Sequence, residues 1–430
     1  MIERYALSPM KELWTLEAQY ARWLRVELAA LRAMETMGEV PEGTSTAVAQ
    51  AVHVDVDAFL AEEATIGHDL LAFVRVLERQ AGDPGRFLHR GLTSSDIKDT
   101  ALSLALRDAA DLLAAACDRL LESLARRAAA HKELLMIGRT HGMHAQPTTL
   151  GLKFHAWREA VRRARQRLGT ARDAVAVGKL SGPVGTYPFA SAESEAAACE
   201  LLGLIPATGV TQVVPRDLHA DLLYALVGIA GAAETIALEV RHLSRTEVGE
   251  IEEPRPEGSS SMPHKRNPIT SERICGLARV LRGHLVAQLE SVALWHERDM
   301  SHSSVERIVL PDSMIVVHYI LERLRAVVDG LVVHEETIAA NLAGASDTVH
   351  SQAYLYALVE AGMTREAAHD ALRAAAAHAQ ALGTPLARQL SEDARRGAVP
   401  AVHVPLDALE ERLRATSRRI IDASSSEDPA

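Results

Sequence analysis

The sequence contains few aromatic residues and few cysteines, and both scarcities restrict its interpretation. Aromatic residues make up 4% of the 430 residues, so aliphatic side chains must build most of the core. The three cysteines, Cys117, Cys199 and Cys275, are widely spaced and odd in number, and no CxxC pair occurs. This pattern is typical of reduced thiols in a cytoplasmic protein and argues against a disulfide framework or a zinc site. We therefore expect neither a metal nor another cofactor.

The chain also lacks a recognisable signal peptide and a continuous apolar run approaching 18 residues. These absences predict a cytoplasmic protein without a membrane partner. The net charge of −11 and the lack of a basic stripe argue against a nucleic-acid partner. An acidic protein that binds an anion must concentrate its positive charge locally. Arginine and lysine residues inside motifs are therefore informative.

Alanine, leucine, arginine and glutamate dominate the composition, and these residues favour helix. Apolar side chains recur at helical spacing in five stretches, which we interpret as helices that neither glycine nor proline interrupts: residues 106–124, 150–172, 222–243, 277–289 and 314–328. The pattern predicts an all-α fold, with a long central helical bundle between two smaller helical domains.

We place the predicted domain boundaries near the Gly- and Pro-rich interruptions. The N-terminal helical domain spans residues 1–93, the central bundle 94–345 and the C-terminal helical domain 346–430. Several helices of the bundle are apolar on more than one face, as in residues 230–237. One subunit cannot cover all of these faces, so we expect a homo-oligomer, and specifically a homotetramer.

The most informative motif is residues 258–268, Gly-Ser-Ser-Ser-Met-Pro-His-Lys-Arg-Asn-Pro. An ordinary solvated loop with a serine cap is the alternative, but such loops rarely hold lysine, arginine and asparagine between two prolines. The motif resembles the signature loop of the fumarase/aspartase superfamily, and its His264-Lys265-Arg266 variant is most similar to that of the adenylosuccinate lyase family. Further motifs match in the order expected for the family: residues 91–96, 138–144, 178–182 and 295–304.

The resemblance implies catalytic roles that agree with the chemistry of eliminating an amine from a succinyl group. Ser259 corresponds to the base that removes a proton beside a carboxylate. Lys265 and Asn267 correspond to residues that hold the succinyl carboxylate and stabilise its developing charge. His141 corresponds to the acid that protonates the leaving nitrogen, with His68 as its partner. The alternative for both histidines is a structural role, with Asp69 simply holding His68.

The resemblance also implies a substrate-binding set. Arginine forks suit phosphate, and hydroxyl and amide groups supply oriented hydrogen bonds. Helix capping by Thr93 and Ser94, and surface ion pairs of the arginines, are the alternatives; His89 is a weaker candidate. The substrate-binding candidates are Arg4, Tyr5, Asp69, Thr93, Ser94, Thr140, Gln212, Asn267, Arg298, Ser303 and Arg307. In the family the site is assembled from three subunits, so the resemblance implies shared active sites.

The expected activity is release of fumarate from an N-succinyl substrate, first of all adenylosuccinate. Ile66, Gly67 and Leu218 depart from the family pattern and remove polar or cationic side chains, and residues 253–258 form a shortened lead into the signature loop. These departures favour weakened nucleotide binding, improved by Gly67→Arg. They also leave open a member that cleaves another N-substituted aspartate. A non-catalytic helical scaffold is the alternative of another class.

Overall fold

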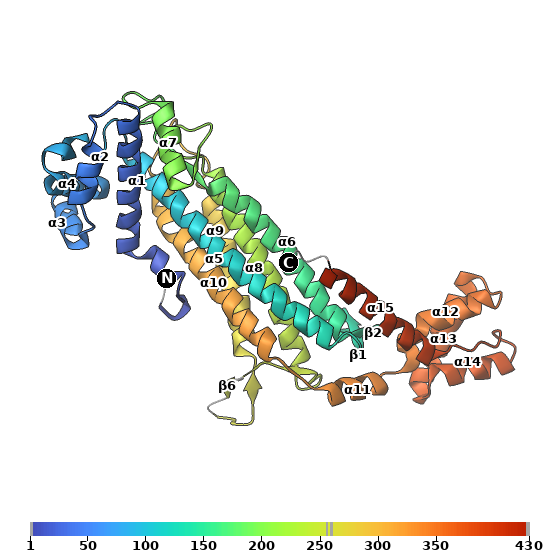
Figure 1. Ribbon diagram of the computed structural model, residues 1–430. Helices are drawn as coiled ribbons and strands as arrows, with labels where there is room; N and C mark the ends of the chain where they lie inside the picture. The colour runs from blue at the N-terminus through green and yellow to red at the C-terminus, as the bar shows by residue number, and fades with distance from the viewer. Residues whose placement is uncertain (1–2, 255–256, 259–260, 427–430) are drawn as a thin grey trace. The chain divides into compact units, whose positions relative to one another are not determined.

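The computed structural model of the protein describes residues 3–254, 257–258 and 261–426. Helices make up about 69% of the chain, which confirms the all-α prediction. The five long helices are α5 (Ser94–Ala130), α6 (Leu150–Val175), α8 (Asp217–Leu243), α9 (Ile269–Leu289) and α10 (Ser301–Gly330) (Figure 1). The expectation that neither glycine nor proline interrupts them was wrong. Gly228 and Gly231 lie within α8, and Pro311 lies within α10, where it removes one backbone donor.

Shorter helices precede and follow the long ones. In the N-terminal part and before α8 they are α1 (Leu16–Thr36), α2 (Thr44–Ala51), α3 (Val56–Ile66), α4 (Asp69–Ala81) and α7 (Ala192–Leu202), with 3-10 turns η1 (Glu3–Tyr5), η2 (Lys11–Trp14) and η3 (Asp83–Phe87). Towards the C-terminus they are α11 (Glu335–Gly344), η4 (Asp347–His350), α12 (Ser351–Glu360), α13 (Arg365–Leu382), α14 (Leu386–Arg395) and α15 (Leu406–Ser426).

The chain folds into two compact units, each built from three separate stretches. Unit 1 comprises Met1–Leu120, Val161–Glu234 and Arg273–Leu324, and unit 2 comprises Leu121–Ala160, Thr235–Glu272 and Arg325–Ala430. Every long helix contributes residues to both units. The division into three domains at residues 93 and 345 stays a prediction.

In unit 1 the long helices pack through buried aliphatic side chains and are joined at their edges by ion pairs. Leu113, Leu222 and Leu310 are fully buried, on α5, α8 and α10 respectively. Arg172 of α6 donates two hydrogen bonds to Asp111 of α5, at 2.8 and 3.0 Å. The apolar contacts supply most of the stability, since exposed ion pairs contribute about 0–1 kcal/mol each.

The scarce aromatic residues are concentrated in the N-terminal part of unit 1. Tyr20 and Trp23 of α1 pack against Phe59 of α3 and Phe73 of α4, with ring centroids 4.8–5.9 Å apart. All four rings are buried in one core with aliphatic residues of α4 and α7. This packing fixes α1 and α4, and both helices carry residues of the candidate site.

Unit 2 has its own small cores and most of the short strands. Leu358, Leu372, Leu386 and Leu390 form one core among α12, α13 and α14. The hairpin of β1 (Leu135–Thr140) and β2 (Met143–Thr149) is antiparallel and was not predicted from the sequence. The remaining strands, each two residues long, pair β3 (Val177–Gly178) with β4 (Ile205–Pro206), β5 (Ile251–Glu252) with β8 (Val332–Val333), and β6 (Glu257–Gly258) with β7 (Arg266–Asn267).

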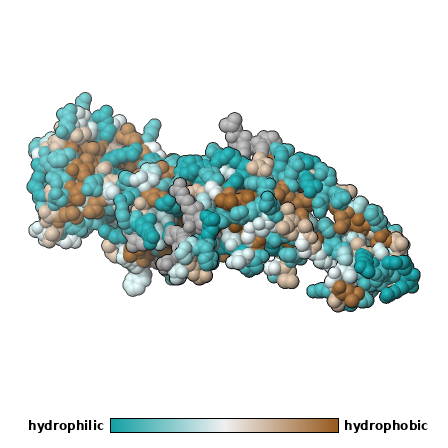
Figure 2. All heavy atoms as spheres, turned by 90° about the horizontal axis from the view of Figure 1, so that it is seen from below, coloured by the Kyte–Doolittle hydropathy of each residue, from teal (hydrophilic) through white to brown (hydrophobic). Residues whose placement is uncertain are grey.

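Helix α8 corrects the expectation about apolar stretches. By length and composition alone it is long and apolar enough to cross a membrane, with a mean hydropathy of 1.6 over its most apolar window. Alanine and glycine between the leucines raise this average, although Glu234 and Glu239 break any continuous apolar run. Half of that window is buried in the protein, and a core helix of a bundle passes the same test. Large apolar residues such as Tyr224 of α8 and Val286 of α9 remain exposed in the single chain, and Figure 2 shows apolar patches among polar side chains on one face.

Candidate functional site

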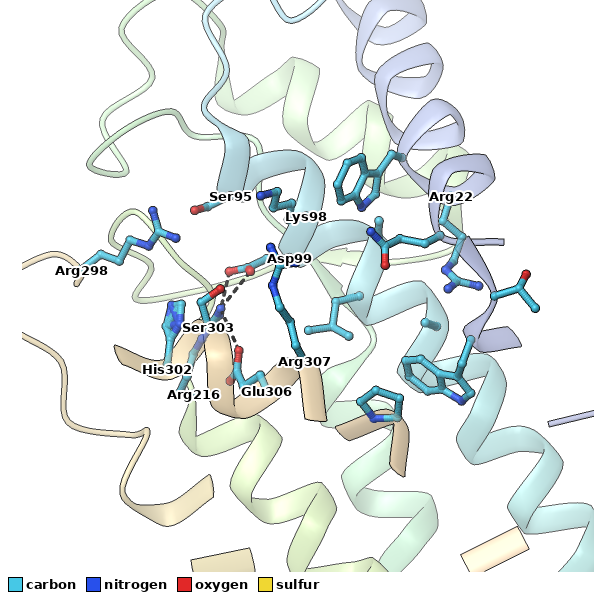
Figure 3. A pocket seen from close by; sticks show the side chains of 18 residues that line it. Arg22, Ser95, Lys98, Asp99, Arg216, Arg298, His302, Ser303, Glu306 and Arg307 are labelled. Carbon is cyan, nitrogen blue, oxygen red and sulfur yellow. Dashed lines mark hydrogen bonds and ion pairs between the residues drawn. The ribbon is translucent and has the colours of Figure 1, made fainter. Parts of the chain in front are cut away.

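A pocket of about 370 Å³ lies within unit 1 and is lined by side chains from α1, α5 and α10. Figure 3 shows Ser95 and Lys98 reaching it from the first turns of α5, and Ser303 and Arg307 from the start of α10. Arg298, in the loop before α10, also lines the pocket, as do Arg22 of α1 and Arg216. The lining combines cationic and hydroxyl groups with the aromatic side chains of Trp14 and Trp23. Such a lining suits a ligand that combines an anionic group with an apolar surface.

The structure therefore brings together three of the predicted substrate-binding residues, Arg298, Ser303 and Arg307. Gln212, also predicted, is attached to this group because its Oε1 accepts a hydrogen bond from Arg298 Nη1 at 2.9 Å. The suggested surface pairing of Arg298 with Glu297 is not among the ion pairs of the described residues. Arg307 pairs with Asp69 rather than with Glu306.

Asp69 joins two cations at this pocket. It accepts hydrogen bonds from Lys98 Nζ and, at 2.9 Å, from Arg307 Nη2. Burial opposes ionisation of the carboxyl group, but these partners lower the pKa of Asp69 to about 2. Asp69 is thus ionised at neutral pH and fixes the positions of Lys98 and Arg307. The alternative in which Asp69 simply holds His68 is therefore too narrow, and the predicted role of Asp69 in substrate binding stays a prediction.

A buried ionic cluster beneath the pocket escaped the sequence analysis. Arg216 donates to both carboxylate oxygens of Asp99, at 2.7 and 2.9 Å, and lies 3.3 Å from a carboxylate oxygen of Glu306. His219 Nδ1 lies 2.9 Å from the other oxygen of Glu306. The cluster ties α5, α8 and α10 together at the level of Ser303 and Arg307. Only the Arg216-Asp217 pair in the sequence hinted at it.

Replacing Glu306 by glutamine is expected to weaken the acid sensitivity of folding. Burial opposes ionisation of Glu306, but attraction to His219 and Arg216 lowers its pKa from 4.5 to about 2. The ionised group therefore stabilises the fold above its ordinary pKa, and this stabilisation is lost as the pH falls towards 2. We expect the wild-type protein to lose about 1 kcal/mol through this group between about pH 6 and pH 3.5. The free energy of unfolding is measured by urea denaturation at both pH values, and Glu366→Gln, at an exposed position of α13, is the control. If Glu306→Gln lost as much stability in acid as the wild-type protein does, Glu306 would not be the group responsible.

The N-terminus of α5 is organised by Asp96 rather than by the predicted hydroxyls. Asp96 accepts the backbone N–H of Thr93 at 2.8 Å and that of Gly182 at 3.1 Å, and it pairs with the fully buried Lys179. Thr93 and Ser94 themselves are half-buried at the start of the helix. Since the cap is made by Asp96, neither hydroxyl is required for it, and both remain candidates for substrate binding.

His68 and His89 have distinct environments. His68 precedes α4 as its N-cap, and its Nδ1 accepts the backbone N–H of Leu71 at 3.1 Å. A neutral His68 ring therefore carries its hydrogen on Nε2, and the ring is exposed. His89 Nδ1 instead lies 2.7 Å from the buried Glu27; burial opposes the charged form, but Glu27 raises the pKa of His89 above its usual value. His89 is a structural residue, whereas His68 is available to a ligand.

Arg4 and Tyr5 lie in the short turn η1. Arg4 is exposed, and the Tyr5 ring packs edge-on against Tyr319 of α10, with centroids 5.1 Å apart. Neither residue lines the pocket of about 370 Å³. Their predicted contact with a nucleotide stays a prediction.

In unit 2, Thr140 and His141 occupy the tip of the β1–β2 hairpin. Thr140 pairs with Met143, so His141 and Gly142 form a two-residue turn, and both have positive φ, 56° and 75°. A turn of this type requires two left-handed residues, and histidine pays roughly 1–2 kcal/mol for that conformation. The turn presents His141 to solvent. Maintained strain of this kind is typical of functional positions.

The hairpin is held by a buried carboxylate. Arg139 of β1 donates two hydrogen bonds to the fully buried Glu250, at 2.6 and 2.9 Å, and Asn341 of α11 donates to Glu250 at 2.9 Å. Glu250 immediately precedes β5. One carboxylate thus fixes both the strand that leads to His141 and the strand that leads towards the signature loop.

The signature loop is partly described. Ser259, the predicted base, and Ser260 lie outside the described residues. Lys265 is exposed, and Asn267 is half-buried at the end of β7, which pairs with β6 and closes the loop at its base. Glu253 caps α9 by accepting the backbone N–H groups of Thr270 and Ser271 at 2.9 and 2.8 Å. The loop therefore emerges from a fixed base.

Comparison with known proteins agrees with this arrangement. A family model described as lyase matches residues 6–283. The chain is 44% identical to the adenylosuccinate lyase of Aquifex aeolicus, over 91% of each chain, and 47% identical to that of Thermotoga maritima, over 86% of each. A solved structure, the fumarate lyase from Mesorhizobium sp. BNC1, superposes with a TM-score of 0.86 at 25% identity, covering 98% of this chain and 99% of that one. The chain therefore belongs to the lyase family of the fumarase/aspartase type, within its adenylosuccinate lyase branch.

Proposed function

We propose that the chain is a carbon–nitrogen lyase of purine biosynthesis that converts adenylosuccinate to AMP and fumarate. The same elimination would convert the succinylated imidazole-carboxamide ribotide, SAICAR, to AICAR and fumarate. The observation that carries the proposal is the gathering of Arg298, Ser303 and Arg307 at one pocket, in a chain that matches adenylosuccinate lyases along about nine tenths of its length. A nucleotide phosphate is the anionic group that such a set of donors fits.

The proposed mechanism uses a base, an acid and an anion-stabilising pair. Ser259 removes a proton from the carbon beside a succinyl carboxylate, and Lys265 and Asn267 stabilise the added negative charge on that carboxylate. The electron pair then forms the carbon–carbon double bond of fumarate as the C–N bond breaks. His141 delivers a proton to the departing nitrogen. His68, which can donate from Nε2, orients the substrate or His141.

A second candidate is cleavage of a different N-substituted aspartate. It is favoured by Gly67 and Leu218, which supply no charge where the family usually does. The elimination residues are unaffected by these departures. The two candidates therefore differ only in the amine that is released.

We also propose that the active protein is a homotetramer whose sites each take residues from three subunits. Exposed apolar residues on α8 and α9, including Tyr224, Val280, Val286 and Leu289, support this proposal because a monomer would leave them in water. A cytoplasmic location belongs to the same proposal, and the buried free thiols of Cys117, Cys199 and Cys275 are compatible with it.

Mixing two inactive variants tests the shared sites. Ser259→Ala and His141→Ala are each expected to be inactive, but after co-refolding in equal amounts about a quarter of the sites would combine an intact Ser259 with an intact His141 from different subunits. Light scattering should show a tetramer for each variant and for the mixture. A fully active monomer at micromolar concentration, or no recovery in mixed tetramers, would contradict the proposal.

The activity itself is tested by incubating the purified protein with adenylosuccinate and measuring fumarate and AMP. Equal amounts of both products are expected. A protein that releases no fumarate from adenylosuccinate, but does so from a smaller N-substituted aspartate, would favour the second candidate.

A further inference from the structure

Lys98 is a cation at the pocket to which neither the motifs nor the family resemblance drew attention. It lies near the N-terminus of α5, its side chain is 26% exposed, and it lines the pocket together with Ser95 and Arg307 (Figure 3). Its ammonium group lies 5.6 Å from the centroid of the buried Trp23 ring. The aromatic contact and the burial hold a normally flexible side chain in one place.

The charges around the pocket do not balance. Asp99 and Glu306 both pair with the buried Arg216, so this group keeps one negative charge when histidines are counted as neutral. Four further cations line the pocket, Arg22, Lys98, Arg298 and Arg307. Arg22 and Arg298 have neutral partners, since Arg22 donates to the Leu13 carbonyl and Arg298 to the Gln212 amide oxygen. Asp69 supplies one negative charge to Lys98 and Arg307 together. The pocket lining therefore carries an excess of about two positive charges, which suits a doubly charged anion such as a phosphate monoester.

Several polar groups that line the pocket also have hydrogen-bonding atoms without a partner among the described residues. An ammonium group has three donors, and within the described part of the chain Asp69 is the acceptor recorded for Lys98. His302, which is only 2% exposed and lines the pocket, has no hydrogen-bond partner for either ring nitrogen among the described residues. The same holds for the buried Nε of Arg298. Buried polar atoms are seldom left unpaired, so these groups point to a ligand in the pocket.

We propose that Lys98 is a substrate-binding residue that, with Arg307, recognises the phosphate of the nucleotide and so determines specificity for a phosphorylated substrate. This inference rests on the proposed function. Asp69 then acts as a bridge that sets the spacing between the Lys98 ammonium and the Arg307 guanidinium. Lys98 also supplies the positive charge that Gly67 and Leu218 do not.

The alternative is that Lys98 only neutralises Asp69. The two roles separate when ligands with and without phosphate are compared. Binding is measured as Kd by isothermal titration of the intact protein with AMP and with adenosine. Activity is measured as kcat and KM with adenylosuccinate and with its dephosphorylated nucleoside. The variants are Lys98→Met, Lys98→Gln and Lys98→Arg. Lys132→Met is the matched control, because Lys132 is similarly half-buried and paired with Asp422 but lies on unit 2.

For Lys98→Met we expect Kd for AMP and KM for adenylosuccinate to rise roughly 10- to 100-fold, with kcat and the adenosine and nucleoside values little changed. Lys98→Arg should stay within a few-fold of wild type, and Lys132→Met should match it. If Lys98→Met does not fold, Lys98→Gln is assessed by the same comparison. Equal losses for phosphorylated and unphosphorylated ligands, or no loss at all, would overturn the proposal. If the wild-type protein releases no fumarate from adenylosuccinate, the proposed function fails, while the AMP and adenosine titrations still decide the role of Lys98.

Discussion

Replacing Ser259 by alanine is expected to lower kcat for adenylosuccinate by about 10³-fold or more, the largest effect we predict. Proton-transfer groups typically contribute about 10²–10⁴-fold, and a base without a substitute contributes at the upper end. No other hydroxyl can take over if the base must sit at one place in the loop. The reaction is followed by fumarate release at saturating substrate.

Two controls make this result interpretable. Ser261→Ala, two residues further along the same loop and exposed, should leave kcat within a few-fold of wild type. Ser259→Ala should also keep the wild-type mass in solution and the wild-type affinity for AMP. Near-normal turnover in Ser259→Ala would remove Ser259 from the mechanism.

The second large effect is expected for His141→Ala, with a loss of about 10²–10⁴-fold in kcat. The His141 side chain is exposed at the tip of a hairpin, and the Arg139–Glu250 pair holds strand β1 close to that tip, so its removal should not disturb the fold. Alanine also relieves no strain, because its φ would still be positive at this turn. His369→Ala, an exposed histidine of α13, is the control.

A second histidine variant separates the roles of the two candidates. His68→Ala removes the N-cap of α4, which should cost roughly 0.5–2 kcal/mol of stability. It should reduce kcat less than His141→Ala does. If His68→Ala proves the more damaging at equal folded fraction, His68 is the acid and His141 its partner.

The long helices were predictable because each carries a 3.6-residue apolar repeat over many turns. The β1–β2 hairpin was not, because its strands lack a clear alternation and lie between two long helices. The signal that could have revealed it is His141-Gly142, two residues suited to a left-handed turn, between Arg139-Thr140 and Met143-His144.

The residues of the candidate site that belong to sequence motifs were predictable. Those that only tertiary contacts bring together were not. Arg298, Ser303 and Arg307 lie close together in the sequence, in the loop before α10 and in the first turns of that helix. Lys98 and Asp69 lie on different helices, α5 and α4, and come into contact only when the chain folds, so no local sequence pattern predicts their ion pair. The same is true of the pairing between Asp99 and Arg216, which are 117 residues apart.

The structure also changes the expectation for Gly67. This glycine ends α3 in the left-handed conformation, with φ of 69° and its N–H donated to Glu63. An arginine there would be strained by roughly 1–2 kcal/mol. Because Lys98 already supplies a cation, we now expect Gly67→Arg to bring little or no gain in KM.

Nucleotide-specific lyase activity is tested most directly by comparing kcat/KM for adenylosuccinate with kcat/KM for an N-substituted aspartate that lacks a ribose phosphate. We expect fumarate release from adenylosuccinate with a preference of at least about 100-fold, because the smaller substrate would leave the hydrogen-bond donors of the pocket unpaired. The contrary result is efficient fumarate release from the smaller compound and none from adenylosuccinate. That outcome would show that the lyase chemistry is retained but that the pocket of Lys98, Arg298 and Arg307 does not recognise a nucleotide.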